Sequence, residues 1–402
     1  MRVWIRLAFS LLLVIWTLNA GDWPRFRGPK GDGISDEVGV VEKWSLKMPS
    51  KKWQASVGTG FSSMVVAKDR VYTMGNREDT DIVSCLDALS GKEIWNYRYP
   101  CSLAAKYYKG GPGATPTLWA GKVYTFSKDG QVYCLDAVTG AKVWGKELKK
   151  DLGLELPKWG FASSPFVMGK LLILNAGASG VALDLEKGSV KWSSGKAAGG
   201  YATPVLWKRE GREELLLFSA GHLNGLDPQS GKVAWSHPWK TSYDVNAADP
   251  VVAGERVFIT SGYKTGCTSL SVKGEKVKVL WTNKALASQM STPVLREGFL
   301  YGIDGNAGGG KPRLKCLELA TGKELWAKEG FGCGSLILAG DRLIILSESG
   351  ELVIAAADPS AFKEYARAKV LSGVCWTSPV LAGGRLYVRS GDGDLVCLEA
   401  GE

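Results

Sequence analysis

Short apolar stretches that alternate with polar residues run through almost the whole chain after residue 20. Val71-Tyr72-Thr73-Met74, Val123-Tyr124-Thr125-Phe126 and Leu386-Tyr387-Val388 are typical of half-buried β-strands. Asp-Gly dipeptides such as Asp129-Gly130 and Asp392-Gly393 lie between such stretches, and they favour the tight turns of β-hairpins. No segment beyond residue 20 shows sustained helical periodicity. The pattern therefore predicts an all-β chain of antiparallel strands.

A longer repeat organises these strands. The sequence from Leu86 to Trp95, LDALSGKEIW, recurs at 135–144, 183–192, 226–235 and 317–326, and more loosely before Trp281 and Trp53. The spacing of about 45 residues belongs to four-stranded propeller blades or to helical HEAT-type repeats. Because each unit contains strands and hairpins, the helical alternative is excluded. Each repeat is therefore expected to fold as one blade, and the tryptophan on its last strand is expected to dock on the next blade. The docking tryptophans are Trp53, Trp95, Trp144, Trp192, Trp235, Trp281 and Trp326.

The end of the chain indicates how the ring closes. Residues 334–371 form a degenerate unit with Asp358-Pro359-Ser360 in place of the usual turn, and residues 377–402 supply only three strands. The strand around Trp53 can complete that last unit, which would leave no exposed sheet edge. We therefore predict an eight-bladed β-propeller of four-stranded antiparallel blades over residues 48–402. Seven blades would require the degenerate unit to be an insertion.

The first twenty residues have the features of a secretory signal peptide. Arg2 and Arg6 precede an apolar run from Leu7 to Leu18, and small Ala20 precedes polar residues. We expect cleavage after Ala20, an N-terminal extension at 21–47, and an exported protein of the periplasm or cell envelope without a stable membrane span. An uncleaved anchor is the alternative. The formal net charge is +10, but basic residues do not form long runs, so the charge fits an anionic envelope partner better than nucleic acid. A basic surface that is merely solvated is the alternative.

The repeat resembles that of the quinoprotein-type propellers. This superfamily includes the pyrroloquinoline-quinone dehydrogenases and the outer-membrane assembly factor of the β-barrel insertion machinery. The Asp-x-x-Thr-Gly-Lys-x-x-Trp turn is the blade signature of the superfamily, and the opening sequence from Asp22 to Pro29 is similar to that of many exported bacterial propellers. The dehydrogenases of this superfamily stack their quinone between a tryptophan and a disulfide of two adjacent cysteines, bind Ca²⁺, and use an aspartate as the base. The resemblance implies a site of this kind if the chain is a dehydrogenase. The segment Tyr243-Asp244-Val245-Asn246 resembles the dehydrogenase segment that carries the base, and it resembles the corresponding step of the assembly factor equally well. Asp244 is therefore a candidate base and Trp376 a candidate stacking residue only if the chain is a dehydrogenase, and no two cysteines are adjacent.

Candidate ligand-binding residues follow from the repeat register. Propeller sites lie at the channel mouth, so the residues that precede each Ser/Thr-Pro step are expected there. Aromatic and amide side chains at these positions would suit a planar ligand or a sugar; packing of these side chains into a plug is the alternative. The candidates are Phe61, Phe161, Tyr201, Asp244, Asn246, Gln289, Met290 and Trp376. Cys333 and Cys375 fall at the mouth on adjacent blades and form a possible disulfide in an oxidising compartment.

Other chemistry has little support in the sequence. The chain has only two histidines, so a histidine-rich metal site or a Ser-His-Asp triad is not expected. We predict a monomeric, non-catalytic scaffold or ligand- and protein-binding module, with an envelope protein or polysaccharide as partner and with no cofactor or metal. A dehydrogenase that uses pyrroloquinoline quinone with Ca²⁺ is one alternative. A carbohydrate-binding or lyase propeller is the other.

Overall fold

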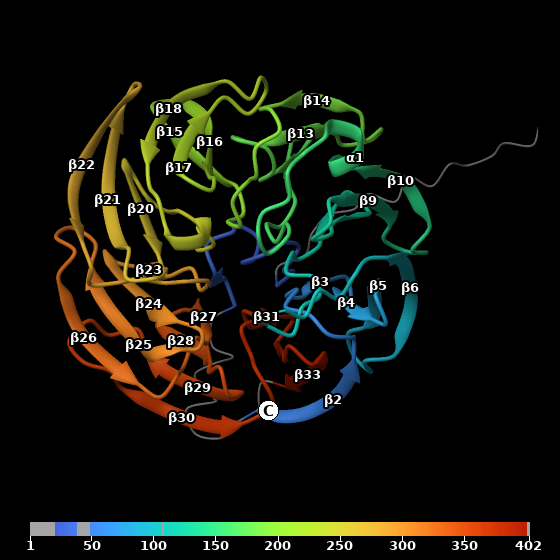
Figure 1. Ribbon diagram of the computed structural model, residues 1–402. Coiled ribbons are helices and arrows are strands. Elements are labelled where there is room, and N and C mark those ends of the chain that lie inside the picture. The colour runs from blue at the N-terminus through green and yellow to red at the C-terminus, as the bar shows by residue number, and fades with distance from the viewer. Residues whose placement is uncertain (1–20, 38–48, 107, 400–402) are drawn as a thin grey trace, which may run out of the picture.

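The computed structural model describes residues 21–37, 49–106 and 108–399. The predicted signal peptide, residues 1–20, lies outside the described residues. Eight sheets of four strands each surround a central channel, and a short strand is added to one of them (Figure 1). The prediction of an eight-bladed propeller is therefore confirmed. Among the described elements, α1 (Leu148–Leu152) and the 3₁₀ turn η2 (Ser242–Asp244) are helical, and no described helix is long and apolar enough to cross a membrane.

The blades follow one another in chain order. Blade 1 comprises β3 (Val65–Ala67), β4 (Arg70–Arg77), β5 (Thr80–Asp87) and β6 (Glu93–Pro100). Blade 2 comprises β7 (Thr117–Trp119), β8 (Lys122–Phe126), β9 (Gln131–Asp136) and β10 (Lys142–Glu147). Blade 3 comprises β11 (Phe166–Met168), β12 (Leu171–Leu174), β13 (Val181–Asp184) and β14 (Val190–Ser193). Blade 4 comprises β15 (Val205–Arg209), β16 (Arg212–Phe218), β17 (His222–Leu226) and β18 (Val233–Pro238).

The second half of the ring has the same arrangement. Blade 5 comprises β19 (Val251–Ala253), β20 (Arg256–Ser261), β21 (Gly266–Lys273) and β22 (Lys276–Asn283). Blade 6 comprises β23 (Val294–Arg296), β24 (Phe299–Asn306), β25 (Gly309–Glu318) and β26 (Glu324–Glu329). Blade 7 comprises β27 (Ser335–Ala339), β28 (Arg342–Leu346), β29 (Glu351–Ala356) and β30 (Glu364–Lys369). Blade 8 comprises β31 (Val380–Ala382), β32 (Arg385–Arg389), β33 (Asp394–Glu399) and, from the other end of the chain, β2 (Ser50–Ser56). The antiparallel pairing of β2 with β33 confirms the predicted closure, since it places Trp53 opposite Cys397.

The repeated turn forms the joint between blades. In blade 2, Asp136 Oδ1 accepts hydrogen bonds from the backbone of Val138 and Thr139, which holds the turn between β9 and β10. Trp95 of blade 1 donates its indole N–H to the carbonyl of Ala137 in that turn, over 3.1 Å. Gly140 then lies flat against the indole, because a Cβ at this position would come within 2.6 Å of it. Equivalent pairs are Trp53 with Gly91, Trp144 with Gly188, Trp192 with Gly231, and Trp281 with Gly322.

The degenerate blade 7 lacks this tryptophan. The register of β29 with β30 places Ala366 opposite Ile354, where the other blades have tryptophan. In blade 8 the third and fourth strands come from opposite ends of the chain, so no repeat turn joins them. A tryptophan at position 366 would therefore have no turn to dock on. Ring closure therefore accounts for the missing tryptophan, whereas the irregular turn of blade 7 still docks its neighbour, because Trp326 donates its indole N–H to the carbonyl of Asp358.

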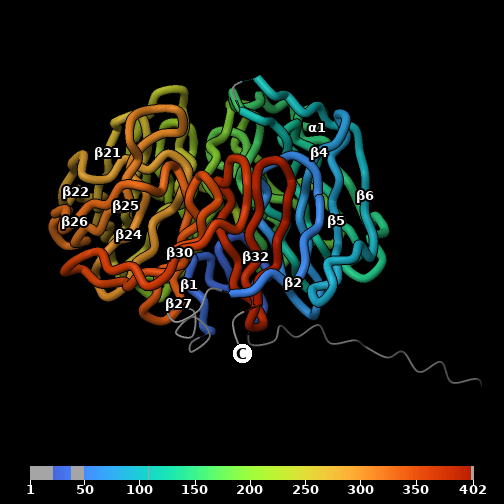
Figure 2. The backbone as a smooth tube through the Cα atoms, turned by 90° about the horizontal axis from the view of Figure 1, so that it is seen from below, coloured from blue at the N-terminus to red at the C-terminus, as the bar shows by residue number. Residues whose placement is uncertain are grey.

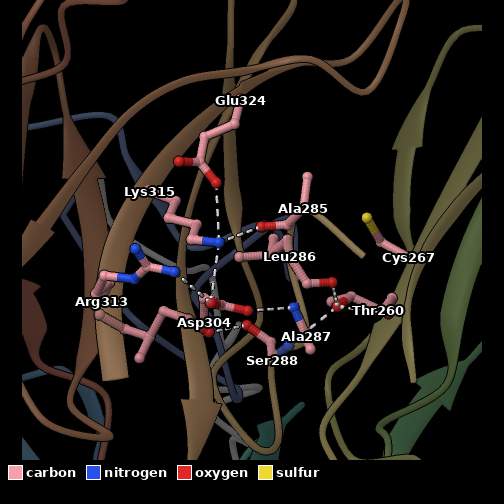
Figure 3. Close-up of polar contacts among 12 residues, drawn as sticks. Thr260, Cys267, Ala285, Leu286, Ala287, Ser288, Asp304, Arg313, Lys315 and Glu324 are labelled. Carbon is pink, nitrogen blue, oxygen red and sulfur yellow. Dashed lines mark hydrogen bonds and ion pairs between the residues drawn. The ribbon is translucent and has the colours of Figure 1, made fainter. Parts of the chain in front are cut away.

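An ionic cluster in blade 6 holds the connection that comes from blade 5 (Figure 3). The Lys315 ammonium is only 4% exposed and lies 2.9 Å from Asp304 Oδ2 and 2.9 Å from Glu324 Oε2. It also donates to the carbonyl of Ala285 over 2.6 Å, while Asp304 Oδ1 accepts the backbone N–H of Ala287. All three protons of Lys315 therefore have acceptors, which a buried ammonium group requires.

Residues 21–37 cross the channel at one end and form its floor. Figure 2 shows β1 (Ile34–Ser35) at the end of the ring opposite α1. Trp23 pairs with Val66 of blade 1, Pro24 accepts the backbone N–H of Leu118 in blade 2, and β1 pairs in parallel with β27 of blade 7. These contacts reach inner strands on several sides of the ring, so the floor segment is integral to the folded propeller.

Candidate functional site

A cavity of about 350 Å³ occupies the channel above the floor segment. Its volume lies at the lower end of the range for small-molecule pockets. The connections into the innermost strands deliver most of the lining, and Phe26 of the floor segment also lines it. Of the candidates predicted from the sequence, six line this cavity: Phe61, Phe161, Tyr201, Gln289, Met290 and Trp376.

The structure does not bring Asp244 and Asn246 to the cavity. Asp244 is exposed, with a positive φ of 58° in the turn η2. Asn246 is fully buried, and its side chain joins structural elements of blades 4 and 5. Its Oδ1 accepts from Thr241 and Ser261, and its Nδ2 donates to the carbonyl groups of Ser219, Ala220 and Trp239. The Asn246 amide therefore has no capacity left for a ligand.

One wall of the cavity is aromatic. The rings of Phe61 and Trp376 stack with centroids 4.7 Å apart and an interplanar angle of 26°. Glu348 fixes the orientation of Trp376 by accepting its indole N–H over 2.8 Å. Tyr108 lies between this pair and Trp159, with ring centroids 5.9 Å from Phe61 and 6.2 Å from Trp159. The aromatic side chains thus form a continuous curved wall and are held in place before any ligand binds.

The opposite side of the cavity is polar but uncharged. Gln289 Oε1 accepts the backbone N–H of Ala307 over 2.7 Å, and its Nε2 donates to the Tyr263 hydroxyl over 3.2 Å. The Tyr201 hydroxyl accepts the backbone N–H of Trp159 over 3.3 Å. Burial raises the pKa of Tyr201 to about 12, so this hydroxyl stays neutral and can donate a hydrogen bond.

A belt of side-chain oxygens lines the lower cavity along six of the eight blades and explains the Ser/Thr-Pro step of the repeat. From blade 1 to blade 6, one residue at the start of each blade is linked to its equivalent in the next blade. The backbone N–H of each donates to the side-chain oxygen of the next, over 2.7–3.1 Å. These linked residues are Ser63, Thr115, Ser164, Thr203, Asp249 and Thr292. The belt fixes the inner strands relative to one another and sets the diameter of the cavity.

Asp249 is the charged member of this belt. Burial raises the pKa of its carboxyl to about 6, although the Arg27 guanidinium and the backbone N–H of Thr203 oppose the shift. Arg27 Nε lies 4.0 Å from Asp249 Oδ2, and Arg27 also donates to the carbonyl groups of Thr292 and Pro293. Asp249 therefore anchors the floor segment and is engaged in the structure of the ring.

Tyr108, Lys128, Trp159 and Tyr263 also line the cavity but were missed by the sequence reasoning. Tyr108 and Trp159 lie on the long connections 101–116 and 148–165, which the repeat register does not align. The two longest spacings between docking tryptophans, Trp95 to Trp144 and Trp144 to Trp192, contain these connections. Excess loop length at the mouth was the signal that could have indicated them.

All eight cysteines are buried free thiols, so no disulfide joins Cys333 to Cys375 in the structure. Both residues lie beside Glu348: its Oε2 accepts the backbone N–H of Cys333, and its backbone carbonyl accepts the N–H of Cys375. Burial raises the pKa of each thiol to about 12, which makes neither a good nucleophile.

Comparison with known proteins establishes the family. The family model described as outer membrane protein assembly factor BamB matches the chain over residues 41–144, 78–328 and 310–402. The chain belongs to the BamB family. No curated protein sequence matches it.

Solved structures share the BamB-like fold. BamB from Moraxella catarrhalis is 18% identical with a TM-score of 0.61, and the match covers 86% of this chain and 98% of that one. Quinohemoprotein alcohol dehydrogenase from Comamonas testosteroni is 16% identical with a TM-score of 0.68, over 95% of this chain and 81% of that one. These likenesses show a propeller common to BamB and to quinone dehydrogenases, and a shared fold does not determine activity.

The residues around the cavity do not fit pyrroloquinoline quinone with Ca²⁺. This cofactor carries carboxylates that need cationic partners, and Ca²⁺ prefers several oxygen ligands, carboxylates above all. Among the described lining residues the charged ones are Lys128, which pairs with Asp129 at 3.0 Å, and Asp249, which belongs to the belt. The described residues contain no cluster of three or more His, Cys, Asp or Glu side chains that could hold a metal ion.

Proposed function

We propose that this protein is a non-catalytic binding module of the bacterial cell envelope, and that its ligand enters the aromatic cavity at the channel mouth. The observation that carries the proposal is the cavity itself. It is closed on one side by the floor segment, its aromatic side chains are fixed in position, and its charged groups are already paired. Such a site can bind a ligand, and its described lining residues include no unpaired charged group that could serve as an acid or base.

Filling the cavity tests this proposal. Ala162 lines the cavity, so Ala162→Trp places an indole inside it. Ala141 is an exposed residue of the repeat turn, where other blades have Lys92, Lys232 and Lys323; Ala141→Trp is therefore a matched control. Ligand-observed NMR with a mixed library of small compounds should find ligands that bind the wild type and Ala141→Trp but not Ala162→Trp. Equal binding by all three proteins would contradict the proposal.

The non-catalytic part of the proposal needs a separate assay. The purified protein is incubated with pyrroloquinoline quinone and Ca²⁺ and assayed for a bound-cofactor spectrum and for dye-linked oxidation of alcohols and sugars. We expect no turnover above the free cofactor. Turnover that Ala162→Trp abolishes would show that the cavity is an active site and would overturn this part of the proposal.

The first described residues are compatible with cleavage after Ala20. Trp23 is only 2% exposed and packs in the floor segment, three residues after the predicted cleavage point at Ala20. Removal of residues 1–20 would therefore leave the floor complete. Mass spectrometry of the protein from the envelope fraction should give an N-terminus at Gly21, whereas a chain beginning at Met1 would contradict cleavage.

A further inference from the structure

The aromatic side chains of the cavity are partly exposed. Phe61, Tyr108, Trp159, Tyr263 and Trp376 are neither fully buried nor fully exposed, and all of them line the cavity. A ring that is buried on one side and open on the other can accept a ligand that presents a flat apolar face. Pyranose rings present such faces through their C–H groups, and they stack on Trp, Tyr and Phe for this reason.

The charges around the cavity argue against an ionic ligand. Lys128 is 6% exposed at its side chain and pairs with Asp129, while Asp249 faces Arg27 of the floor segment. An anionic or cationic ligand buried here would need a partner of opposite charge, because an unpaired buried charge is strongly unfavourable. The described lining residues offer no unpaired charge of either sign.

The neutral polar groups argue against a purely apolar ligand. Gln289 uses one of its two amide protons on Tyr263, and the hydroxyl groups of Tyr201 and Tyr263 each accept one hydrogen bond and retain a proton to donate. These donors face the same cavity as the aromatic wall. A hydrocarbon would bury them without partners, whereas the hydroxyl groups of a sugar can satisfy them.

We propose that the cavity binds an uncharged saccharide, and that it takes a chain end because the floor segment closes the channel beneath it. This inference rests on the proposed function, in which the cavity is the ligand site. The stacked pair of Phe61 and Trp376 is the platform for a sugar ring, and Gln289, Tyr201 and Tyr263 donate to its hydroxyl groups.

Calorimetric titration with short glycans of known charge tests the inference. The uncharged probes are maltotriose, cellotriose, xylotriose and the trimer of N-acetylglucosamine; the charged probe is trigalacturonate. We expect at least one uncharged trimer to bind and trigalacturonate to bind at least tenfold more weakly. Trp376→Ala should weaken the uncharged trimer about tenfold or more, and Trp376→Phe should recover most of the affinity because it restores the stacking face.

Trp119→Ala is the matched control, since Trp119 is 44% exposed and lies outside the cavity lining. It should bind as the wild type does. Failure of every uncharged trimer, or binding that Trp376→Ala leaves unchanged, would overturn the saccharide assignment. If other compounds still bind the wild type but not Ala162→Trp, the proposed function stands without the saccharide; if none does, both fail.

Discussion

Gly140→Ala should destabilise the ring far more than the same substitution in an open turn. Gly140 has φ of 74°, so an alanine there carries left-handed backbone strain of about 1–2 kcal/mol. Its new Cβ would also lie 2.6–2.7 Å from two carbons of Trp95. That indole is only 9% exposed and its N–H is bonded to Ala137, so it cannot move away freely. Overpacking of this kind costs about 1–3 kcal/mol, and the total loss should be roughly 2–5 kcal/mol.

Gly169→Ala is the control for backbone strain alone. Gly169 has φ of 57°, and a Cβ there would meet nothing within 4 Å. Urea unfolding followed by far-UV circular dichroism should therefore show a loss of about 1–2 kcal/mol for Gly169→Ala. Combining each substitution with Trp95→Ala completes the test: the extra cost of Gly140→Ala should disappear in that background, while the cost of Gly169→Ala should not change. Equal costs for the two glycines, or no coupling to Trp95, would refute the blade-docking role of the repeat turn.

Two further predictions concern buried charge. Asp249→Asn should flatten the pH dependence of stability: the folded wild type holds a proton on Asp249 up to about pH 6, while the unfolded chain loses it near pH 4. The wild type should therefore lose about 2 kcal/mol relative to the variant as the pH rises from about 4 to 6, and about 3 kcal/mol over the wider range from about pH 3 to 7. An unchanged slope in urea unfolding would contradict this. Lys315→Met should cost about 3 kcal/mol in the same assay because it leaves Asp304 without its buried partner. Lys208→Met, which breaks an exposed pair with Glu213, should cost less than about 1 kcal/mol; similar costs for the two lysines would count against a buried role for Lys315.

The sequence allowed the fold to be predicted because the repeat reports a physical joint. Each Asp-x-x-x-Gly turn and each tryptophan are needed for one blade to dock on the next, so their period counts the blades. The degenerate turn of blade 7 was visible in the sequence, but the cause of the missing tryptophan was not. It depends on the closure of blade 8, in which β2 and β33 come from opposite ends of the chain.

The candidate site could be predicted only in part. The repeat register indicated the residues on the innermost connections, such as Tyr201 and Trp376, because these occupy equivalent positions in each blade. It could not indicate that Asn246 turns away from the channel to bond with Thr241 and Ser261. Nor could it place Tyr108, since the conformation of a long connection depends on contacts with other blades.

Binding to the filled-cavity variant Ala162→Trp decides whether the mouth cavity is the ligand site. The best ligand of the wild type, whether an uncharged trisaccharide or another compound, is titrated against Ala162→Trp and against Ala141→Trp. We expect the affinity to fall at least tenfold in Ala162→Trp and to be unchanged in Ala141→Trp. Undiminished affinity in Ala162→Trp would show that the ligand binds elsewhere on the propeller and that the mouth cavity is not its site.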